Sequence, residues 1–256
     1  MLRGIFLWAS VVITLFRFGP LAWGANYRDP ATGMEFVLVK GGCFQTGDIF
    51  GNGYPDKSPV HKVCVNDFYI GKYEVTQAQW KAVMGNNPSS FKSCGDNCPV
   101  EAVSWDEAKE FLEQLGKKTG KKYRLPLESE WEYAARSGGK KEKWSGTSDK
   151  SKLGDYAWYE GNSDGRTHPV GMKKPNGLGI YDMSGNVWEW MEDKHYENFN
   201  KRPGSNLEVP GKWEYCVLRG GDWSGSPEDL RFVARNVSRA IETDLTIGFR
   251  AAFPAR

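Results

Sequence analysis

The chain has 256 residues, with 34 Lys and Arg against 32 Asp and Glu and a net charge of +2. This near balance argues against a strong positive field for nucleic acid or for an anionic membrane surface. The 11 Trp and 30 Gly favour a loop-rich fold held by aromatic packing over a helical bundle.

Residues 1–24 are predicted to be a signal peptide. Arg3 gives a positive start, an apolar run follows, and Ala22 and Gly24 are small residues where a signal peptidase would cleave. Arg17 interrupts the apolar run, which argues against a membrane span, although a retained anchor is the alternative. We therefore expect export to the periplasm or beyond, with no membrane contact after cleavage. No Pro- or Ser-rich linker follows, so residues 25–256 are predicted to form one domain.

Three helices are predicted from capping residues and apolar spacing. They run from Thr76 to Gly85, from Ser104 to Gly116, and over residues 128–136. Short alternating runs predict strands at residues 36–39, 63–69, 215–219, 231–235 and 247–252. Residues 138–152, rich in Gly, Lys and Ser, are interpreted as a solvated loop rather than a basic binding patch. The mixture indicates an α+β fold with little regular structure.

Export would allow the five cysteines to form disulfides. Cys43 and Cys64 lie in two strand-like runs, and Cys94 and Cys98 bracket a tight turn. We predict the pairs Cys43–Cys64 and Cys94–Cys98, which leave Cys216 over, although spacing alone allows other pairings. A zinc site at Cys94 and Cys98 is the alternative, but no His or Cys pair is placed to complete it.

Six stretches together resemble the formylglycine-generating enzyme family, the sulfatase-modifying factors. In chain order they are GKYEVTQAQWKAVMG, CPVEAVSWDEAKEFL, YRLPLESEWEYAARSGG, HPVGMKKPNGLGIYDMSGNVWEW, VLRGGDW and IGFRAAF. The resemblance covers residues 34–253. It implies a single compact α+β domain, related to the C-type-lectin-like fold and poor in regular structure, that contains structural calcium.

The segment DMSGNVWEW places Trp188 and Trp190 on one face of a strand and Glu189 on the other. The resemblance implies that a calcium ion is bound by four residues of this segment: Asp182, Gly185, Val187 and Glu189. Carboxylates and carbonyls at this spacing suit calcium, which takes six to eight oxygen ligands. The alternative is that Asp182 and Glu189 cap backbone amides. A second family calcium site is not expected, because Trp158 replaces an amide there.

Copper-dependent formylglycine formation is not expected. Family members with that activity hold copper(I) between two cysteines that follow the Arg-Gly-Gly motif. Residues 219–231 contain no cysteine here, and Cys216 precedes the Gly-Gly turn and is single.

Other relatives keep the fold and use different chemistry. Some bind iron through histidines, largely from an added helical domain that this chain lacks. Its histidines are His61, His168 and His195, and we expect His168 to order a loop rather than bind iron. Periplasmic relatives that mature the pyoverdine chromophore also lack the copper cysteines. A smaller departure is Leu127, where the family usually has a Thr helix cap, which leaves Glu130 to stabilise the helix start.

Two functions are therefore predicted as alternatives. The first is an exported accessory or binding module, stabilised by calcium, for a protein, peptide, glycan or metabolite; we expect it to be monomeric and to bind no nucleic acid. The second is an oxidase or maturation enzyme without the copper pair, of the formylglycine-generating or pyoverdine-maturation kind.

The stretch after the Gly-Gly turn carries the candidate residues for both functions. Catalytic candidates are Asp222, Ser224 and Glu228, and ligand-surface candidates are Trp223, Arg231 and Arg235. The two arginines either clamp an anionic ligand or pair with Asp222 and Glu228; we favour the pairing.

Overall fold

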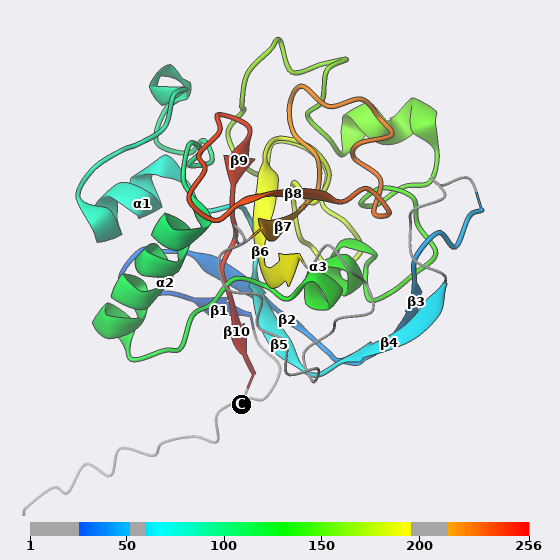
Figure 1. Cartoon of the computed structure of the whole chain (residues 1–256), viewed down its shortest axis with the longest axis horizontal. Helices are drawn as coiled ribbons and strands as arrows, with labels where there is room; N and C mark the ends of the chain where they lie inside the picture. Colours follow the sequence, from blue (N-terminus) through cyan, green and yellow to red (C-terminus); the bar gives the residue numbers. More distant parts are fainter. Residues whose placement is uncertain (1–25, 52–59, 196–214, 256) are drawn as a thin grey trace, which may run out of the picture.

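The computed structural model describes residues 26–51, 60–195 and 215–255. The predicted signal peptide therefore lies outside the described residues. Within them, no helix is both long enough and apolar enough to span a bilayer. The predicted α+β architecture with long connecting loops is confirmed (Figure 1).

One antiparallel sheet joins the two ends of the described chain. Its order is β1-β2-β5-β10, and its strands are β1 (Tyr27–Arg28), β2 (Glu35–Val39), β5 (Phe68–Gly71) and β10 (Ala252–Pro254). Because β10 pairs with β5, the end of the chain closes onto a strand that lies early in the sequence.

A second sheet is the β3–β4 ribbon, at the opposite side of the molecule from α1 and α2 (Figure 1). It consists of β3 (Gly42–Thr46) and β4 (His61–Val65), and Cys43 pairs with Cys64 across the ladder. Both predicted disulfides, Cys43–Cys64 and Cys94–Cys98, are confirmed. Cys216 takes part in neither and is buried.

The third sheet lies at the centre of the molecule and has the order β8-β7-β6-β9. Its strands are β6 (Trp188–His195), β7 (Tyr215–Arg219), β8 (Asn236–Arg239) and β9 (Ile247–Gly248). The β6–β9 pair is parallel, and the others are antiparallel. Trp188 and Trp190 of β6 pack into the main apolar core, as the alternation predicted.

Three α-helices occur in the described residues: α1 (Gln77–Met84), α2 (Trp105–Thr119) and α3 (Glu128–Ala135). Two short 3₁₀ helices, η1 (Lys92–Cys94) and η2 (Lys150–Asp155), lie in loops. Thr76 and Ser104 form the predicted capping boxes. At α3, Leu127 caps nothing with its side chain, and its backbone N–H donates to Glu130 (3.0 Å), as expected.

The predicted end of α2 at Gly116 is wrong. The helix continues to Thr119 and ends at Gly120, whose φ of 74° provides the left-handed cap. Gly116 serves a different purpose. A Cβ there would lie 2.7 Å from the carbonyl oxygen of Lys121, so the missing side chain lets the following chain pass close to the helix.

Three strand predictions also need correction. The run 63–69 breaks at residues 66–67, where Asp67 accepts a hydrogen bond from the Gly41 amide (2.8 Å). The run 247–252 is not one strand, because its middle crosses from the central sheet at β9 to the first sheet at β10. Residues 231–235 form a turn, closed by the Ala234 amide on the Arg231 carbonyl (2.8 Å).

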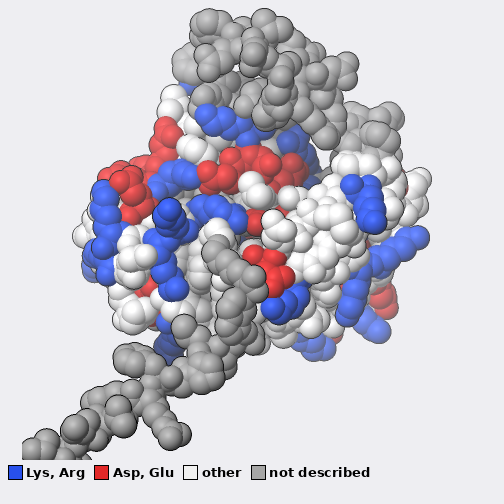
Figure 2. All heavy atoms as spheres, turned by 90° about the horizontal axis from the view of Figure 1, so that it is seen from below, with Lys and Arg blue, Asp and Glu red and all other residues white. Residues whose placement is uncertain are grey.

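The loop 138–152 is less solvated than we expected. Trp144 is buried and donates through Nε1 to the Pro227 carbonyl (2.7 Å), and Ser145 is buried too. Four lysines of this loop are exposed, and Lys143 is half-buried. On the face that Figure 2 shows, positive and negative side chains are interspersed, so that face has no single-sign field.

A fully buried ion pair joins the central sheet to the crossing segment between β9 and β10. Arg250 donates through Nε to Glu189 Oε2 and through Nη2 to Oε1, both at 2.7 Å. The remaining nitrogen of Arg250, Nη1, donates to the Gly71 carbonyl of β5 (3.0 Å). One guanidinium therefore ties together β6, β5 and the crossing segment.

Arg250→Met should destabilise the fold by about 3–5 kcal/mol, because it leaves the Glu189 carboxylate buried without its cation. Urea unfolding in buffer with EGTA measures the change. The double variant Glu189→Gln/Arg250→Met should be more stable than the single variant. Lys174→Met, which breaks an exposed pair with Asp155, should leave the midpoint unchanged. An Arg250→Met midpoint equal to that of the control would contradict the role of the pair.

Leu127→Thr should stabilise the fold by about 1 kcal/mol, because its hydroxyl would cap an amide of the first turn of α3. The backbone of Leu127 is already extended, and its side chain is 39% exposed, so the change leaves no cavity. Thermal unfolding checks it, with Leu127→Ala as the control that adds no hydroxyl. A gain of the same size in both variants would show that the hydroxyl is not the cause.

Candidate functional site

Three buried carboxylates gather around the single guanidinium of Arg250. Glu189 pairs with it directly, and Glu74 and Asp182 are close enough to act on its charge. Glu74 accepts from Asn186 Nδ2 (2.6 Å) and from the Val187 amide (3.2 Å). Asp182 accepts from the Gly171 amide through Oδ2 (2.7 Å), while its Oδ1 is buried with no hydrogen-bond partner in the described chain.

This cluster carries more negative than positive charge in a place that water does not reach. Burial raises the pKa of Asp182 to about 6. Burial raises the pKa of Glu74 well above its usual value, and the charges of Asp182 and Glu189 raise it further. The excess charge has to be compensated by protons or by a bound cation.

Of the four predicted calcium ligands, Asp182 and Glu189 belong to this cluster and the Val187 amide donates to Glu74. Gly185 instead donates to the Gly220 carbonyl (2.9 Å) and bridges to Trp158. Asp182 offers the unpartnered Oδ1. Within the described chain, Glu189 Oε1 accepts from Arg250, whereas Oε2 accepts from both Arg250 and Trp131. Among the described residues, no three His, Cys, Asp or Glu side chains are arranged to hold a metal. A calcium ion would therefore depend on the carbonyls of Gly185 and Val187. These oxygen donors fit calcium rather than a softer metal.

The alternative interpretation was that Asp182 and Glu189 cap backbone amides, and the structure shows such a contact for Asp182 but not for Glu189. Asp182 does accept from a backbone amide, that of Gly171, whereas the partners of Glu189 are side chains. Glu74 was missed from the sequence. In the sequence, Glu74 is marked only by its place beside Val75, directly before the capping residue Thr76.

Asn186 connects this cluster to the surface. Its side chain donates to Glu74 and accepts from the His168 amide (3.0 Å), and its carbonyl accepts from the Trp223 amide (3.0 Å). The φ of Asn186 is 67°, a left-handed conformation in which Asn is one of the few favoured side chains. The loop after the Gly-Gly turn is therefore positioned by the buried cluster.

Asp222, Ser224 and Glu228 do not form one catalytic group. Asp222 Oδ1 accepts from the amide (2.5 Å) and the hydroxyl (2.6 Å) of Ser224. Burial raises the pKa of Asp222, and the hydrogen bonds from Ser224 act in the opposite direction. Glu228 instead pairs with Arg231 (3.1 Å). The other predicted arginine, Arg235, pairs with Glu128 (2.8 Å) and not with Asp222 or Glu228.

Trp223 is half-buried at the surface. Its ring meets Phe91 edge to face, with centroids 5.5 Å apart, and its Nε1 lies 3.5 Å from the Leu245 carbonyl. Phe91 is held in turn by Glu101, whose Oε1 accepts from its amide (2.8 Å). Sequence reasoning found Trp223 but missed Phe91 and Glu101, which lie far from it in the chain.

Carboxylates surround this aromatic pair. Glu101 is fully buried, and its Oε2 has no hydrogen-bond partner among the described residues. Burial raises the pKa of Glu101, and the nearby charge of Asp244 raises it further, as it also does for Asp222. Three acidic groups and two aromatic rings therefore share one region, which we call the Trp223 face: Phe91, Glu101, Asp222, Trp223 and Asp244.

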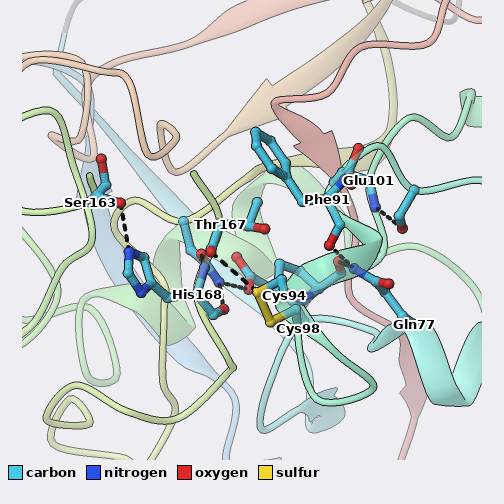
Figure 3. The surroundings of a disulfide bond; sticks show 12 residues. Gln77, Phe91, Cys94, Cys98, Glu101, Ser163, Thr167 and His168 are labelled. Atoms are coloured by element: carbon cyan, nitrogen blue, oxygen red, sulfur yellow. Dashed lines mark hydrogen bonds between the residues drawn. A yellow bond between two sulfur atoms is a disulfide. The ribbon is translucent and has the colours of Figure 1, made fainter. Parts of the chain in front are cut away.

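The Cys94–Cys98 disulfide holds the loop that carries Phe91 (Figure 3). Gln77 of α1 donates to the Phe91 carbonyl (3.2 Å). The sulfur of Cys94 lies 3.2 Å from the carbonyl oxygen of Thr167. With both sulfurs in a disulfide, the zinc alternative for this pair does not apply.

His168 orders a loop, as expected. Its Nε2 lies 2.7 Å from the Ser163 carbonyl oxygen (Figure 3), so that nitrogen carries the proton. Its ring stacks on Trp158 with centroids 3.7 Å apart. Lys173 places its ammonium 3.8 Å from the centroid of the same indole. The ammonium therefore lies at cation–π distance from the Trp158 ring.

Comparisons with known proteins agree with this fold. The chain is 37% identical to a protein named chaperone protein LppX of Paenibacillus barcinonensis, over 75% of this chain and 79% of that one. It resembles the structure of Treponema denticola variable protein 1 with a TM-score of 0.76 and 29% identity, over 90% of this chain and 98% of that one. It resembles PvdO from Pseudomonas aeruginosa with a TM-score of 0.73, the same identity and the same coverage.

A family model described as the sulfatase-modifying factor enzyme 1-like domain matches residues 24–255. That match covers nearly the whole chain, including the six stretches on which the resemblance to the formylglycine-generating enzymes rested. The chain belongs to the sulfatase-modifying factor enzyme 1-like family.

Proposed function

We propose that this protein is an exported accessory or binding module that recognises a polypeptide segment through the Trp223 face. The observation that carries the proposal is the loop after the Gly-Gly turn. Where copper-dependent relatives would place a thiol pair, it presents a half-buried tryptophan, packed against Phe91 and anchored through Asn186. The relative named chaperone protein LppX supports the same class of function.

The chemistry of the Trp223 face favours a basic and partly apolar segment. Lys and Arg side chains are attracted both to carboxylates and to the faces of aromatic rings. The buried Oε2 of Glu101 still has the capacity to accept a hydrogen bond. Leu245, whose carbonyl lies beside Trp223, is 40% exposed and extends the apolar area. A rigid aromatic anchor within a polar rim is the usual composition of a binding hot spot.

We further propose that one calcium ion compensates the charge of Glu74, Asp182 and Glu189. The ion would be structural, because the three carboxylates are buried and Asn186 connects them to the Trp223 face. Copper has no comparable place in the proposal, since the sequence offers no thiol pair after Arg219.

An oxidase or maturation enzyme is the second candidate function. The observation that favours it is the contact between Ser224 and the buried Asp222, a carboxylate whose pKa is raised by burial. Acid–base residues often have such shifted pKa values. In this alternative a substrate would still lie on the Trp223 face, and substrate-dependent oxygen uptake would identify the activity.

Trp223→Ala should weaken binding to basic, aromatic-containing peptides by about tenfold or more, because removal of a hot-spot tryptophan costs about 2 kcal/mol or more and about 1.4 kcal/mol is tenfold. The probe is an array of 12-residue peptides that vary in Lys, Arg, Phe and Leu content. Affinities of the selected peptides are then measured in solution by fluorescence anisotropy.

Tyr73→Ala is the matched control for that experiment. Tyr73 is also half-buried, and it contacts one other aromatic ring, that of Tyr181, at 5.1 Å. Glu101→Gln tests the charge separately, and it should weaken binding to Lys- and Arg-containing peptides only. Equal affinities for the wild type and Trp223→Ala, with both proteins folded, would remove the Trp223 face from the proposal.

Calcium should raise the thermal midpoint of the wild type relative to EGTA, because it binds the folded state and not the unfolded one. Asp182→Asn should reduce this response. The same change should raise the midpoint in EGTA, because it removes one charge of a buried like-charged group. Asn suits the φ of 57° at this position and keeps an acceptor for Gly171.

Asp155→Asn is the control for the calcium experiment, because Asp155 is exposed and pairs with Lys174. Its response to calcium should match that of the wild type. A wild-type midpoint that is the same in calcium and in EGTA would contradict the proposed ion.

A further inference from the structure

A narrow crevice opens on a part of the surface that shares no residue with the Trp223 face. Its lining comes from the loop after β3, the end of α3, the following loop and the turn after residue 230. The lining residues that matter here are Asp48, Arg136, Glu142, Lys143 and Arg231. The crevice holds about 180 Å³ of empty space, counted out to its mouth.

Arg136 is the first residue after α3 and is only 1% exposed. One nitrogen, Nη2, lies 2.8 Å from Glu132 Oε1. Its Nε and Nη1 are buried and have no hydrogen-bond partner within the described chain. Burial lowers the pKa of this guanidinium, while the charge of Glu132 raises it.

Arg231 lines the same crevice and is 8% exposed. Its Nη1 pairs with Glu228 (3.1 Å), a residue whose side chain is half exposed. Its Nε and Nη2 are buried and unpartnered in the described part of the structure. Two arginines therefore bring four buried donor nitrogens without partners to one place.

The acidic groups nearby do not meet these four nitrogens. Glu132 is shared with Arg219, at 2.9 Å, and Glu142 accepts from the Ser137 hydroxyl (3.1 Å). Asp48 also lines the crevice and has contacts of its own. A buried donor without an acceptor is costly, and native structures nearly always supply a water, an ion or a ligand.

We propose that this crevice binds a tetrahedral oxyanion, a phosphate or sulfate, through Arg136 and Arg231. Planar guanidinium groups offer paired N–H donors that match the oxygens of such anions. Lys143 lines the same crevice and adds positive charge. The ammonium groups of Lys141 and Lys143 lie 5.3 and 5.4 Å from the ring of Phe50, another lining residue. The loop 138–152, which was predicted from the sequence to be solvated, thus contributes to the proposed binding site.

In this structure the crevice has no room for a water-sized sphere. Its lining side chains therefore have to move apart when the oxygens of an anion reach the guanidinium groups. The anion is either a free ion or the end group of a monoester. Inorganic phosphate, inorganic sulfate and methyl phosphate separate these two sources.

Isothermal titration calorimetry of the full chain with each of the three anions tests the proposal. We expect saturable binding of at least one of them, and Arg231→Gln should weaken it about tenfold or more, because it removes a charged donor pair. Tighter binding of methyl phosphate than of inorganic phosphate would identify a monoester ligand. Lys152→Gln, at an exposed lysine outside the crevice, should bind like the wild type.

Two results would overturn the proposal. One is a response that sodium chloride reproduces at equal ionic strength, and the other is an unchanged affinity in Arg231→Gln. If that variant does not fold, Lys143→Gln takes its place, and an unchanged affinity there also overturns the site. Loss of peptide binding on the Trp223 face does not affect these outcomes, since the two surfaces share no residue.

Discussion

The buried pair between Glu189 and Arg250 is the contact on which the rest of the structure depends. It joins β6 of the central sheet to the segment that crosses into the first sheet, and Arg250 also holds β5 through the Gly71 carbonyl. The pair leaves the charges of Glu74 and Asp182 only partly compensated. The fold therefore contains a place where a hard cation would be stabilising, and Asn186 links this place to the loop of Trp223.

The route from this buried cluster to the surface is short. Asn186 contacts Glu74 with its side chain and Trp223 with its backbone. The loop after the Gly-Gly turn thus has a fixed position although it contains little regular structure. A fold of this kind can keep its scaffold while the residues of that loop change, so function has to be argued from the loop and not from the fold. Here the loop offers an aromatic anchor and carboxylates, which suit binding better than redox chemistry.

The sequence predicted best what local interactions decide. The capping boxes at Thr76 and Ser104 and the Cys94–Cys98 disulfide lie within a few residues of sequence, and the structure confirms them. Cys43–Cys64, also confirmed, spans 21 residues and was one of several pairings that the spacing allowed. The run 231–235 alternates like a strand but forms a turn: its Phe232 amide bonds the Lys143 carbonyl of a loop far away in the sequence, and its Ala234 amide bonds the Arg231 carbonyl. Glu74 and Arg136 were not recognised because their importance comes from distant partners. Trp223 could be predicted as a site residue from the sequence, whereas Phe91 and Glu101 could not, because they approach Trp223 only in the folded protein.

The most direct test of the account is the metal content of the protein, purified without chelators and measured by elemental analysis. The account predicts near-stoichiometric calcium and no transition metal, which would support a calcium-stabilised binding module. Stoichiometric copper or iron would contradict it, because the protein would then hold a redox ligand set and the oxidase alternative would take precedence.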